Sequence, residues 1–338
     1  MCTAITYSTK NHYFGRNLDF EMTFNEQVVC TPRHFPLNYK CLDEKSFYGE
    51  ADFCKDSHYA ILGMAVVADE YPLYFDALNE KGLAMAGLHF VGNAFYAEPG
   101  KVSCNSEKGE SADCKTAEIA PYELIAWVLS QCETVEQARS LLEHTRPVAV
   151  PFSEEFPLSP LHFMIADKEG SIVVEPVHDG LKIYDNPVGV LTNNPPFPFH
   201  LEYLKNYMNL TAEIPVNRFS GELPLSPYSR GMGALGLPGD NSSSSRFVRA
   251  AFVRANSVSG EGEKESVNQF FHILGSVEQV RGTVRLENGM YEITTYSCCC
   301  NLEEGIYYYR TYEDATLRKT SIWEMNPEGE ALVNISVI

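Results

Sequence analysis

The start of the chain constrains the fold more than any other stretch, because it reads as one β-hairpin. Residues 3–7 alternate in polarity, a polar turn follows, and Tyr13 resumes an extended pattern. Such a hairpin returns Arg16 and Asp19 to the vicinity of Cys2. The sequence therefore predicts that the N-terminus belongs to a sheet and that polar side chains surround a cysteine thiol.

Cys2 follows the initiating methionine, so removal of Met1 would leave a thiol and a free α-amine on one residue. A thiol has an ordinary pKa of about 8.5 and an α-amine one of about 7.7–8.0, so the amine can exchange the thiol proton near neutral pH. Arg16 would favour the thiolate, and Asp19 can accept hydrogen bonds from the ammonium. These residue types predict an acyl-transfer nucleophile that needs no histidine as base. The local alternative is an accidental cysteine followed by a surface turn.

Composition bounds the classes of function. The 338-residue chain can bury a sizeable core, and its hydrophobic share of 44% is that of an ordinary soluble protein. With 45 acidic and 26 basic residues, its formal net charge of −19 would repel phosphate backbones and anionic lipids. We therefore expect no nucleic-acid and no membrane partner. Because the sequence shows no signal peptide and no long apolar run, we also expect a cytoplasmic location.

Ten cysteines are scattered through the chain, and we expect most of them to be reduced and structural. The run Cys298-Cys299-Cys300 looks like a metal signal, but neighbours on a strand point to opposite faces and no histidine or CxxC partner frames them. We expect no metal and no cofactor. The sequence leaves open whether Cys104 and Cys114 pair.

The order of the remaining elements indicates the fold class. Strands are predicted over residues 27–32, 59–67, 73–90 (two strands around a turn at 79–82), 161–166, 171–176, 181–184, 290–300, 305–311 and 320–325. Helices are predicted over 121–131, 135–144 with a capping box at Thr134, 246–252 capped by the preceding serines 242–245, and 267–274 capped by Ser266. Residues 35–56 and 97–114 read as loops, and 219–241 as a segment that covers a surface. The order predicts an α+β fold, with two antiparallel sheets and helices outside, as a single domain over residues 2–338.

Three further residues attract attention on local grounds. Asn193 ends a strand in a proline-fixed segment, where a side-chain amide can donate to an oxyanion; an ordinary asparagine turn is the local alternative. Arg246 lies in the first turn of a predicted helix, where the dipole favours an acid, so we expect it to have a specific partner. His89 lies at a strand end, where a histidine is more often structural.

Several motifs occur in a characteristic order along nearly the whole chain. They are Met1-Cys2-Thr3, Phe14-Gly15-Arg16-Asn17-Leu18-Asp19, Asn79-Glu80-Lys81-Gly82-Leu83, Leu191-Thr192-Asn193, Gly236-Leu237-Pro238-Gly239-Asp240 with Ser245-Arg246-Phe247, and Gly305-Ile306-Tyr307-Tyr308-Tyr309. Together they resemble the choloylglycine hydrolase family of N-terminal-nucleophile hydrolases, which includes bile salt hydrolases and penicillin V acylases. The resemblance implies a four-layer αββα fold and a homo-oligomer, commonly a tetramer.

The resemblance also implies roles for individual residues. Cys2 matches the nucleophile, Arg16 and Asp19 match the pair that tunes and orients it, Asn193 matches the oxyanion amide, and Arg246 matches an active-site arginine. Asn79 matches a family asparagine, which we expect among the catalytic residues. The family's second oxyanion position falls at His89, where bile salt hydrolases resemble one another in having asparagine and penicillin acylases in having tyrosine. A backbone N–H donor would tolerate the change, so the departure bears on substrate preference.

The acyl site of similar enzymes corresponds to apolar residues here. These are Leu18, Phe24, Ala68, Phe75, Phe152 and Phe156. Each alone is typical of ordinary core, but together they favour a steroid nucleus over a small phenoxyacetyl group. We expect hydrolysis of glycine- or taurine-conjugated bile acids, and the sequence does not distinguish between those two or between steroid hydroxylation patterns. A penicillin V acylase, an acyl-homoserine-lactone acylase and a non-catalytic bile-acid-binding protein are the alternatives.

Overall fold

The computed structural model describes residues 1–41, 57–100 and 116–337, and one of its two large sheets contains the N-terminal hairpin. In this sheet the strand order is β12 (Val190–Leu191), β1 (Cys2–Ser8), β2 (His12–Phe20), β13 (Ile293–Asn301), β14 (Ile306–Thr311) and β15 (Arg318–Ser321), all antiparallel. The hairpin register places Cys2 opposite Leu18 and Ala4 opposite Arg16. The predicted return of Arg16 toward Cys2 is therefore confirmed.

The second large sheet is also antiparallel. Its order is β11 (Gly180–Asp185), β10 (Ser171–Val177), β9 (Leu161–Ala166), β6 (Ala84–His89), β5 (Tyr71–Asn79), β4 (Ile61–Ala68), β3 (Gln27–Thr31) and β16 (Val333–Ser336). A separate short parallel pair joins β7 (Ala117–Ile119) to β8 (Thr145–Pro147). The predicted strands of this sheet are confirmed, whereas β16 and the β7–β8 pair, which are only three or four residues long, were not predicted.

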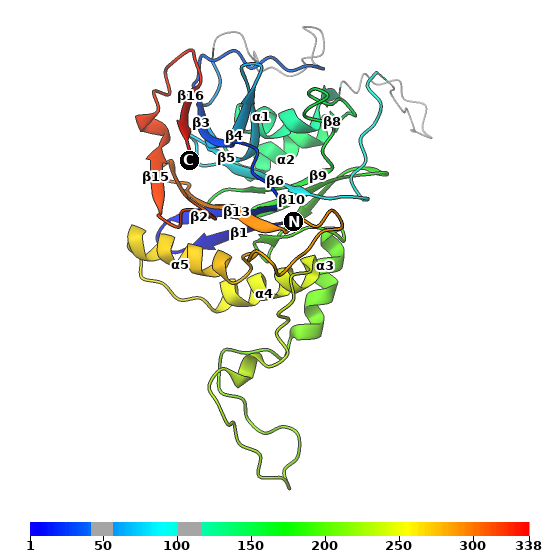
Figure 1. The fold of residues 1–338 in the computed structure, drawn as a ribbon, viewed down its shortest axis with the longest axis vertical. Coiled ribbons are helices and arrows are strands. Elements are labelled where there is room, and N and C mark those ends of the chain that lie inside the picture. The colour runs from blue at the N-terminus through cyan, green and yellow to red at the C-terminus, as the bar shows by residue number, and fades with distance from the viewer. Residues whose placement is uncertain (42–56, 101–115, 338) are drawn as a thin grey trace.

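Helices lie on the outer faces of both sheets (Figure 1). They are α1 (Leu124–Leu129), α2 (Val135–Glu143), α3 (Phe197–Leu204), α4 (Ser243–Asn256) and α5 (Glu263–Gly275). α1 packs on β5 and β6 of the second sheet, while α4 and α5 pack on β1 and β13 of the first. The expected four-layer αββα order, with two antiparallel sheets between helices, is therefore confirmed.

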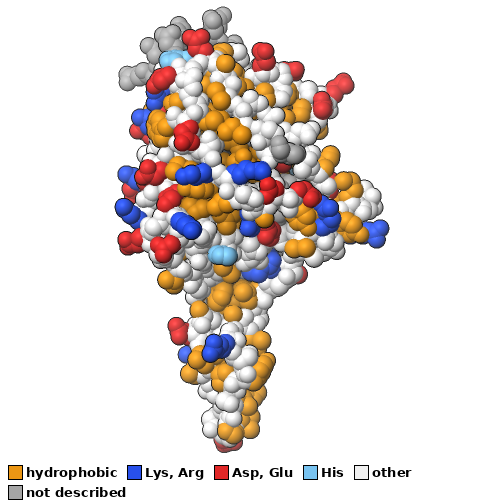
Figure 2. Space-filling view, turned by 60° about the vertical axis from the view of Figure 1, so that its left-hand side comes forward, with side chains coloured by type: hydrophobic (Ala, Val, Ile, Leu, Met, Phe, Trp, Pro, Cys, Tyr) orange, Lys and Arg blue, Asp and Glu red, His pale blue; other side chains and the backbone are white. Residues whose placement is uncertain are grey.

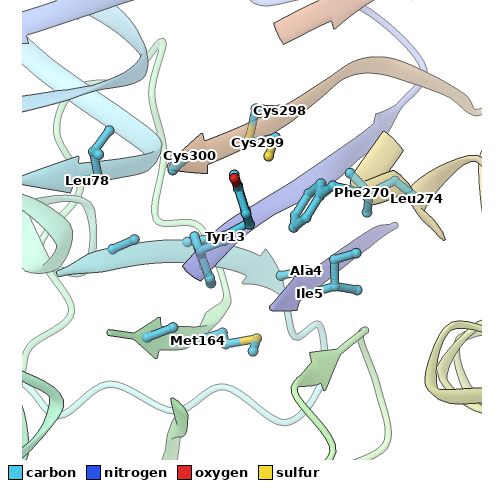
Figure 3. Close-up of a cluster of buried hydrophobic side chains, with 14 of the residues drawn as sticks. Ala4, Ile5, Tyr13, Leu78, Met164, Phe270, Leu274, Cys298, Cys299 and Cys300 are labelled. Atoms are coloured by element: carbon cyan, nitrogen blue, oxygen red, sulfur yellow. The ribbon is translucent and has the colours of Figure 1, made fainter. Parts of the chain in front are cut away.

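The largest hydrophobic cluster joins the two sheets and the helices below the first one. Figure 3 shows members of it from the first sheet (Tyr13), the second sheet (Leu78 and Met164) and α5 (Phe270 and Leu274). All of these side chains are buried. A sheet covered on both faces buries successive residues, which explains why nearly every residue of β1 and β13 is buried, polar ones included.

The helix starts differ in part from the predictions. Thr134 caps α2 as predicted, because its Oγ1 accepts the Gln137 N–H at 3.2 Å. The predicted start of α5 at residue 267 is wrong: the helix begins at Glu263, and Ser266 lies inside it, with its Oγ 2.7 Å from the Thr9 hydroxyl.

The serine caps predicted for α4 are also wrong. Ser242 occupies the N-cap position, but its side chain accepts no hydrogen bond from the first turn. The Asp240 carboxylate instead holds the segment that enters the helix, since it accepts from the Ser242 N–H at 2.9 Å and from the Ser245 hydroxyl at 2.6 Å. The strand predicted over 320–325 is too long, because β15 ends at Ser321 and residues 322–324 form a 3₁₀ turn capped by Ser321.

An extended arm leaves the body after α3 and returns just before α4 (Figure 1). Residues 208–235 form it, and hydrophobic side chains lie along its surface (Figure 2). Met208, Phe219 and Tyr228 are each more than 80% exposed. The prediction that residues 219–241 cover a surface of this chain is therefore wrong, because most of that segment projects away from the body.

Two predicted loops lie partly outside the described residues, and Cys104 and Cys114 fall there. Within the described ranges, no helix has both the length and the apolar character needed to cross a membrane. The same ranges contain no group of three His, Cys, Asp or Glu side chains arranged to hold a metal ion. The expectations about location and metals stay predictions.

Candidate active site

The Cys2 thiol lies at the start of β1, in the buried region where the two sheets meet. Cys2 is 5% exposed, and its backbone N–H donates to Asn193 Oδ1 at 2.8 Å. β12 brings Asn193 to this point, because Leu191 pairs with Ala4 and the strand ends there. When Met1 is absent, the same Cys2 nitrogen is the α-amine, so thiol, amine and side-chain amide lie together.

Met1 prolongs β1 by one residue in the chain as translated. Its ammonium donates to the Asp19 carbonyl at 2.8 Å and contacts the buried Glu292 carboxylate, while its own carbonyl accepts the Asp19 N–H at 2.9 Å. Burial lowers the pKa of this ammonium. No local pattern around Glu292 predicts this contact, because it arises from pairing across distant segments.

Arg16 is fully buried in β2, with its guanidinium toward the second sheet. Its Nη1 donates to the Gly87 carbonyl at 2.5 Å and the Phe75 carbonyl at 3.2 Å, while Nη2 has no hydrogen-bond partner among the described residues. Burial opposes the charge, but the Cys2 thiol and then Tyr296 outweigh it and raise the Arg16 pKa. Arg16 and Cys2 are therefore electrostatic neighbours, as the sequence predicts for this hairpin.

Asp76 is a buried acid near Arg16 that sequence reasoning missed. Its carboxylate accepts from the Tyr296 hydroxyl at 2.5 Å, the Tyr307 hydroxyl at 2.6 Å and the Cys298 thiol at 3.2 Å. These partners come from β13 and β14, which are far from Asp76 in the sequence, so no local motif predicts the contacts. The Cys298 thiol is thus hydrogen-bonded to a buried carboxylate.

Asp19 and Arg246 face each other behind Cys2. Arg246 Nη1 lies 3.9 Å from Asp19 Oδ2, and Asp19 Oδ1 accepts from the Thr294 hydroxyl at 2.6 Å. Burial raises the pKa of Asp19, with Arg246 acting in the opposite direction. Burial lowers the pKa of Arg246, and Asp19 counters it. Two fully buried opposite charges thus stabilise one another next to the nucleophile.

Arg246 also contacts Cys2 and Asn193, which are the specific partners expected from its unfavourable place in the first turn of α4. Its Nη1 donates to the Cys2 carbonyl at 2.5 Å and the Thr3 hydroxyl at 2.6 Å, and its Nη2 donates to Asn193 Oδ1 at 2.7 Å. Since Oδ1 accepts from both Arg246 and Cys2, the orientation of the Asn193 amide is fixed.

The other end of that amide points to His89. Asn193 Nδ2 donates to the His89 carbonyl at 2.8 Å, which leaves its second hydrogen for another acceptor. The Asn193 amide can therefore donate one further hydrogen bond near Cys2, as an oxyanion donor must.

The His89 ring is largely buried beside Phe20, with 5.6 Å between ring centroids. Burial, followed by the N-terminal ammonium and Arg16, lowers the pKa of His89 to about 4. The imidazole is therefore neutral near pH 7.

Asn79 does not lie at this site. Its Nδ2 donates to the carbonyls of Leu129 and Cys132 at 2.8 and 2.7 Å, and its Oδ1 accepts the Leu83 N–H at 3.0 Å. These partners belong to the end of α1 and to the β5–β6 turn, on the helix-covered face of the second sheet. A catalytic role does not fit this placement, and we assign Asn79 to the turn that it stabilises.

The six predicted acyl-site residues fall into separate groups. Leu18 pairs with Cys2 across the hairpin. The Phe24 ring centroid lies 5.5 Å from that of Phe75 and 4.8 Å from that of Phe20, a residue that was not predicted to belong to the site.

Phe152 belongs to another aromatic group. Its ring centroid lies 6.2 Å from that of Phe156, 6.1 Å from that of Tyr71 and 5.3 Å from that of Tyr122. Ala68, the last residue of β4, pairs with Tyr71 and so lies near this group. Two surface pockets of about 480 Å³, one beside α5 and one beside α2, are lined by none of the six.

Two antiparallel sheets between helices, with a cysteine opening the first strand, define the fold of an N-terminal-nucleophile hydrolase. The chain belongs to the choloylglycine hydrolase family of linear amide C–N hydrolases, whose sequence model matches residues 2–334. It is therefore a hydrolase of linear amide C–N bonds.

Known relatives cover nearly all of the chain. It is 49% identical over 322 residues to a bile salt hydrolase/transferase of Lactiplantibacillus plantarum, covering 95% of this chain and 92% of the relative. It is 38% identical over 336 residues to a bile salt hydrolase/transferase of Clostridium perfringens, covering 98% and 95%.

Solved structures agree with the fold. A conjugated bile acid hydrolase from Clostridium perfringens superposes with a TM-score of 0.83 at 35% identity, covering 99% of this chain and 97% of that one. A penicillin V acylase from Agrobacterium tumefaciens gives 0.71 at 20% identity, covering 99% and 91%, and shows the shared fold alone.

Proposed function

We propose that the chain, once Met1 is removed, hydrolyses the amide bond of glycine- or taurine-conjugated bile acids with Cys2 as nucleophile. The observation that supports this most is the hydrogen bond from the Cys2 nitrogen to Asn193 Oδ1, because it joins the future α-amine to the oxyanion amide. The relatives named as bile salt hydrolases support the substrate class.

The reaction begins with attack of the Cys2 thiolate on the amide carbonyl. Asn193 Nδ2 and the His89 N–H donate to the oxyanion, while the buried charge of Arg16 favours the thiolate. The Cys2 ammonium then gives a proton to the departing nitrogen, the C–N bond breaks, and a thioester remains. The free amine next takes a proton from water, the resulting hydroxide attacks the thioester, and the thiolate leaves as the bile acid is released.

The apolar group of Phe20, Phe24 and Phe75 supports a large hydrocarbon acyl group. A steroid nucleus gains roughly 25 cal/mol per Å² of apolar area that it buries and demands few polar contacts. Phe75 also connects this group to the nucleophile, because its carbonyl accepts from Arg16 Nη1 while its ring packs on Phe24.

A substrate panel tests the proposal. Purified enzyme is incubated with taurocholate, glycocholate, penicillin V and an acyl-homoserine lactone, and the kcat/KM for amide cleavage is measured for each. We expect the conjugated bile acids to be cleaved fastest. Preferential cleavage of penicillin V or of the lactone would replace the proposal with that acylase, and tight taurocholate binding without release of taurine would indicate a binding protein.

We also propose a homo-oligomer, a tetramer as the sequence resemblance implies, in which the arm of residues 208–235 contacts another copy. Exposed aromatic and aliphatic side chains along one projecting segment support this, since contiguous apolar surface commonly marks an interaction site. Residues 2–338 would then act as a single domain within each subunit.

A further inference from the structure

Two buried histidines hold the backbone on either side of the Asn193 α-carbon. His162 lies in β9, and its Nε2–H donates to the Thr192 carbonyl at 2.9 Å. His200 lies in α3, and its Nε2–H donates to the Asn193 carbonyl at 2.9 Å. Both histidines are 0% exposed. Because a carbonyl oxygen can only accept, Nε2 carries a hydrogen in each ring.

Each ring also packs on the neighbour of another site residue. The His162 ring stacks on Phe90, with 4.3 Å between centroids and 6° between planes, and Phe90 directly follows His89. The His200 ring stacks on Phe247 at 4.8 Å and 22°, and Phe247 directly follows Arg246. The two histidines therefore link the Asn193 backbone to both of the segments that its side chain contacts.

Glu175 connects the two histidines. Its Oε1 lies 3.1 Å from His162 Nδ1 and accepts the Phe197 N–H at 2.9 Å, at the start of the helix that carries His200. One buried carboxylate thus helps to hold the orientation of the His162 ring and anchors the start of α3.

Asn193 depends on such anchoring because little regular structure holds it. β12 contains two residues and ends at Leu191, and residues 192–196 belong to no strand or helix. Besides the histidines, Ser243 contributes, since its hydroxyl accepts the Asn193 N–H at 2.9 Å. Oxyanion donors lose most of their effect when they move by a fraction of an ångström, so the backbone position matters for rate.

We propose that His162 and His200, supported by Glu175, are positioning residues that hold Asn193 in the geometry that stabilises the oxyanion. The inference rests on the proposed role of Asn193 in amide hydrolysis. It assigns catalytic importance to two histidines that contact neither substrate nor thiol, in an enzyme whose chemistry needs no histidine as base.

The test compares His200→Ala with His200→Gln, using whichever amide the wild type cleaves fastest in the panel. We expect His200→Ala to lower kcat by about 10- to 100-fold and to change KM by less than about threefold, because the donor acts on the transition state. A glutamine amide can donate to the same carbonyl, so His200→Gln restores kcat to within about fivefold of wild type. His162→Gln, which keeps a donor at the other carbonyl, should behave in the same way.

A matched control comes from another histidine bound to backbone carbonyls. His58 has its ring nitrogens 2.7 Å from the Tyr59 carbonyl and 2.9 Å from the Phe35 carbonyl, outside the site. His58→Ala should leave kcat within about twofold of wild type, whatever it does to stability.

The rate of Cys2 alkylation by iodoacetamide separates misplacement of Asn193 from loss of the nucleophile. In His200→Ala it should stay within about threefold of wild type, because Arg16 and the β1–β2 pairing still hold the thiol. Unchanged kcat in a folded His200→Ala, or kcat and alkylation falling together, would overturn the inference. Since the comparison uses any amide that is cleaved, failure of the bile-acid proposal shows only in the wild-type panel.

Discussion

At the scale of single residues, His89 offers a test of how the site is buried. Its folded pKa of about 4 lies below the ordinary 6.5, and burial is the largest cause, so the shift persists after Met1 is lost. Below about pH 6.5 the unfolded chain takes up a proton that the folded chain does not. The stability associated with the neutral ring is therefore complete above pH 6.5 and is lost as the pH falls toward about 4.

Replacing His89 by asparagine removes this acid sensitivity. We expect the free energy of unfolding of His89→Asn to fall less than that of wild type between pH 7 and 4.5, by on the order of 1–2 kcal/mol. Urea unfolding at the two pH values measures the difference. Equal losses in the two proteins would show that the ring protonates freely in the folded state.

Side-chain chemistry and local sequence predicted some of the residues of the candidate active site. Cys2, Arg16 and Asp19 share one hairpin, so their proximity follows from local sequence, and Arg246 was expected to have a partner because of its place in a helix. The sequence around Asn79 is compatible with a catalytic or a structural role. Its hydrogen bonds to the Leu129 and Cys132 carbonyls favour the structural role.

Other members of the site carry no sequence signal. Asp76, Glu292, His162 and His200 become neighbours of the site through pairing and packing between distant segments. Without an alignment, a single buried acid or histidine cannot be told from ordinary core.

At the scale of elements, strands were predicted well and helix starts less well. The N-terminal hairpin follows from an alternating pattern bounded by a turn, and the β4–β5–β6 region follows from apolar and extended runs with a tight turn between the last two. The first turn of α5 is rich in Glu and Lys, so apolar periodicity begins only at Val267, four residues after the helix does. A hydrophobic pattern cannot locate the first residue of a helix whose first turn buries few apolar side chains.

Gly15 tests how closely the strands of the first sheet approach behind Arg16. A Cβ at this position would lie 2.1 Å from the Cys298 carbonyl oxygen in β13. Gly15→Ala should lower the free energy of unfolding by about 1–3 kcal/mol, because backbone must shift to admit the methyl group. Gly170→Ala, where nothing lies within 4 Å, is the control and should change stability by less than about 0.5 kcal/mol. Similar denaturant midpoints for the two variants would contradict the close approach.

At the scale of the whole molecule, the succession of strands and helices predicted two antiparallel sheets with helices outside, and the family resemblance implied the four-layer order. Neither predicted the arm. Its composition, rich in glycine, proline and serine, indicates irregular structure without saying whether the segment lies on its own chain or projects from it. Whether the segment packs on its own chain or projects from it depends on the surface that it contacts, and a single sequence does not identify that surface.

The arm predicts a dependence of assembly on its apolar side chains. Phe219→Glu combined with Tyr228→Glu should convert an oligomer into smaller species, because each glutamate would have to be desolvated in the interface. Light scattering coupled to size exclusion measures the mass. Val258→Glu, at an equally exposed position outside the arm, should leave the mass unchanged. A monomeric wild type at micromolar concentration would contradict the assembly proposal.

The most direct measurement compares wild type with Cys2→Ala for the release of glycine or taurine from conjugated bile acids, with the intact mass of each protein recorded alongside. The account predicts a wild type that lacks Met1 and releases the amino acid, and a folded Cys2→Ala variant whose release does not exceed background. Release by Cys2→Ala, or full activity in a wild type that retains Met1, would contradict the claim that the N-terminal cysteine is the nucleophile.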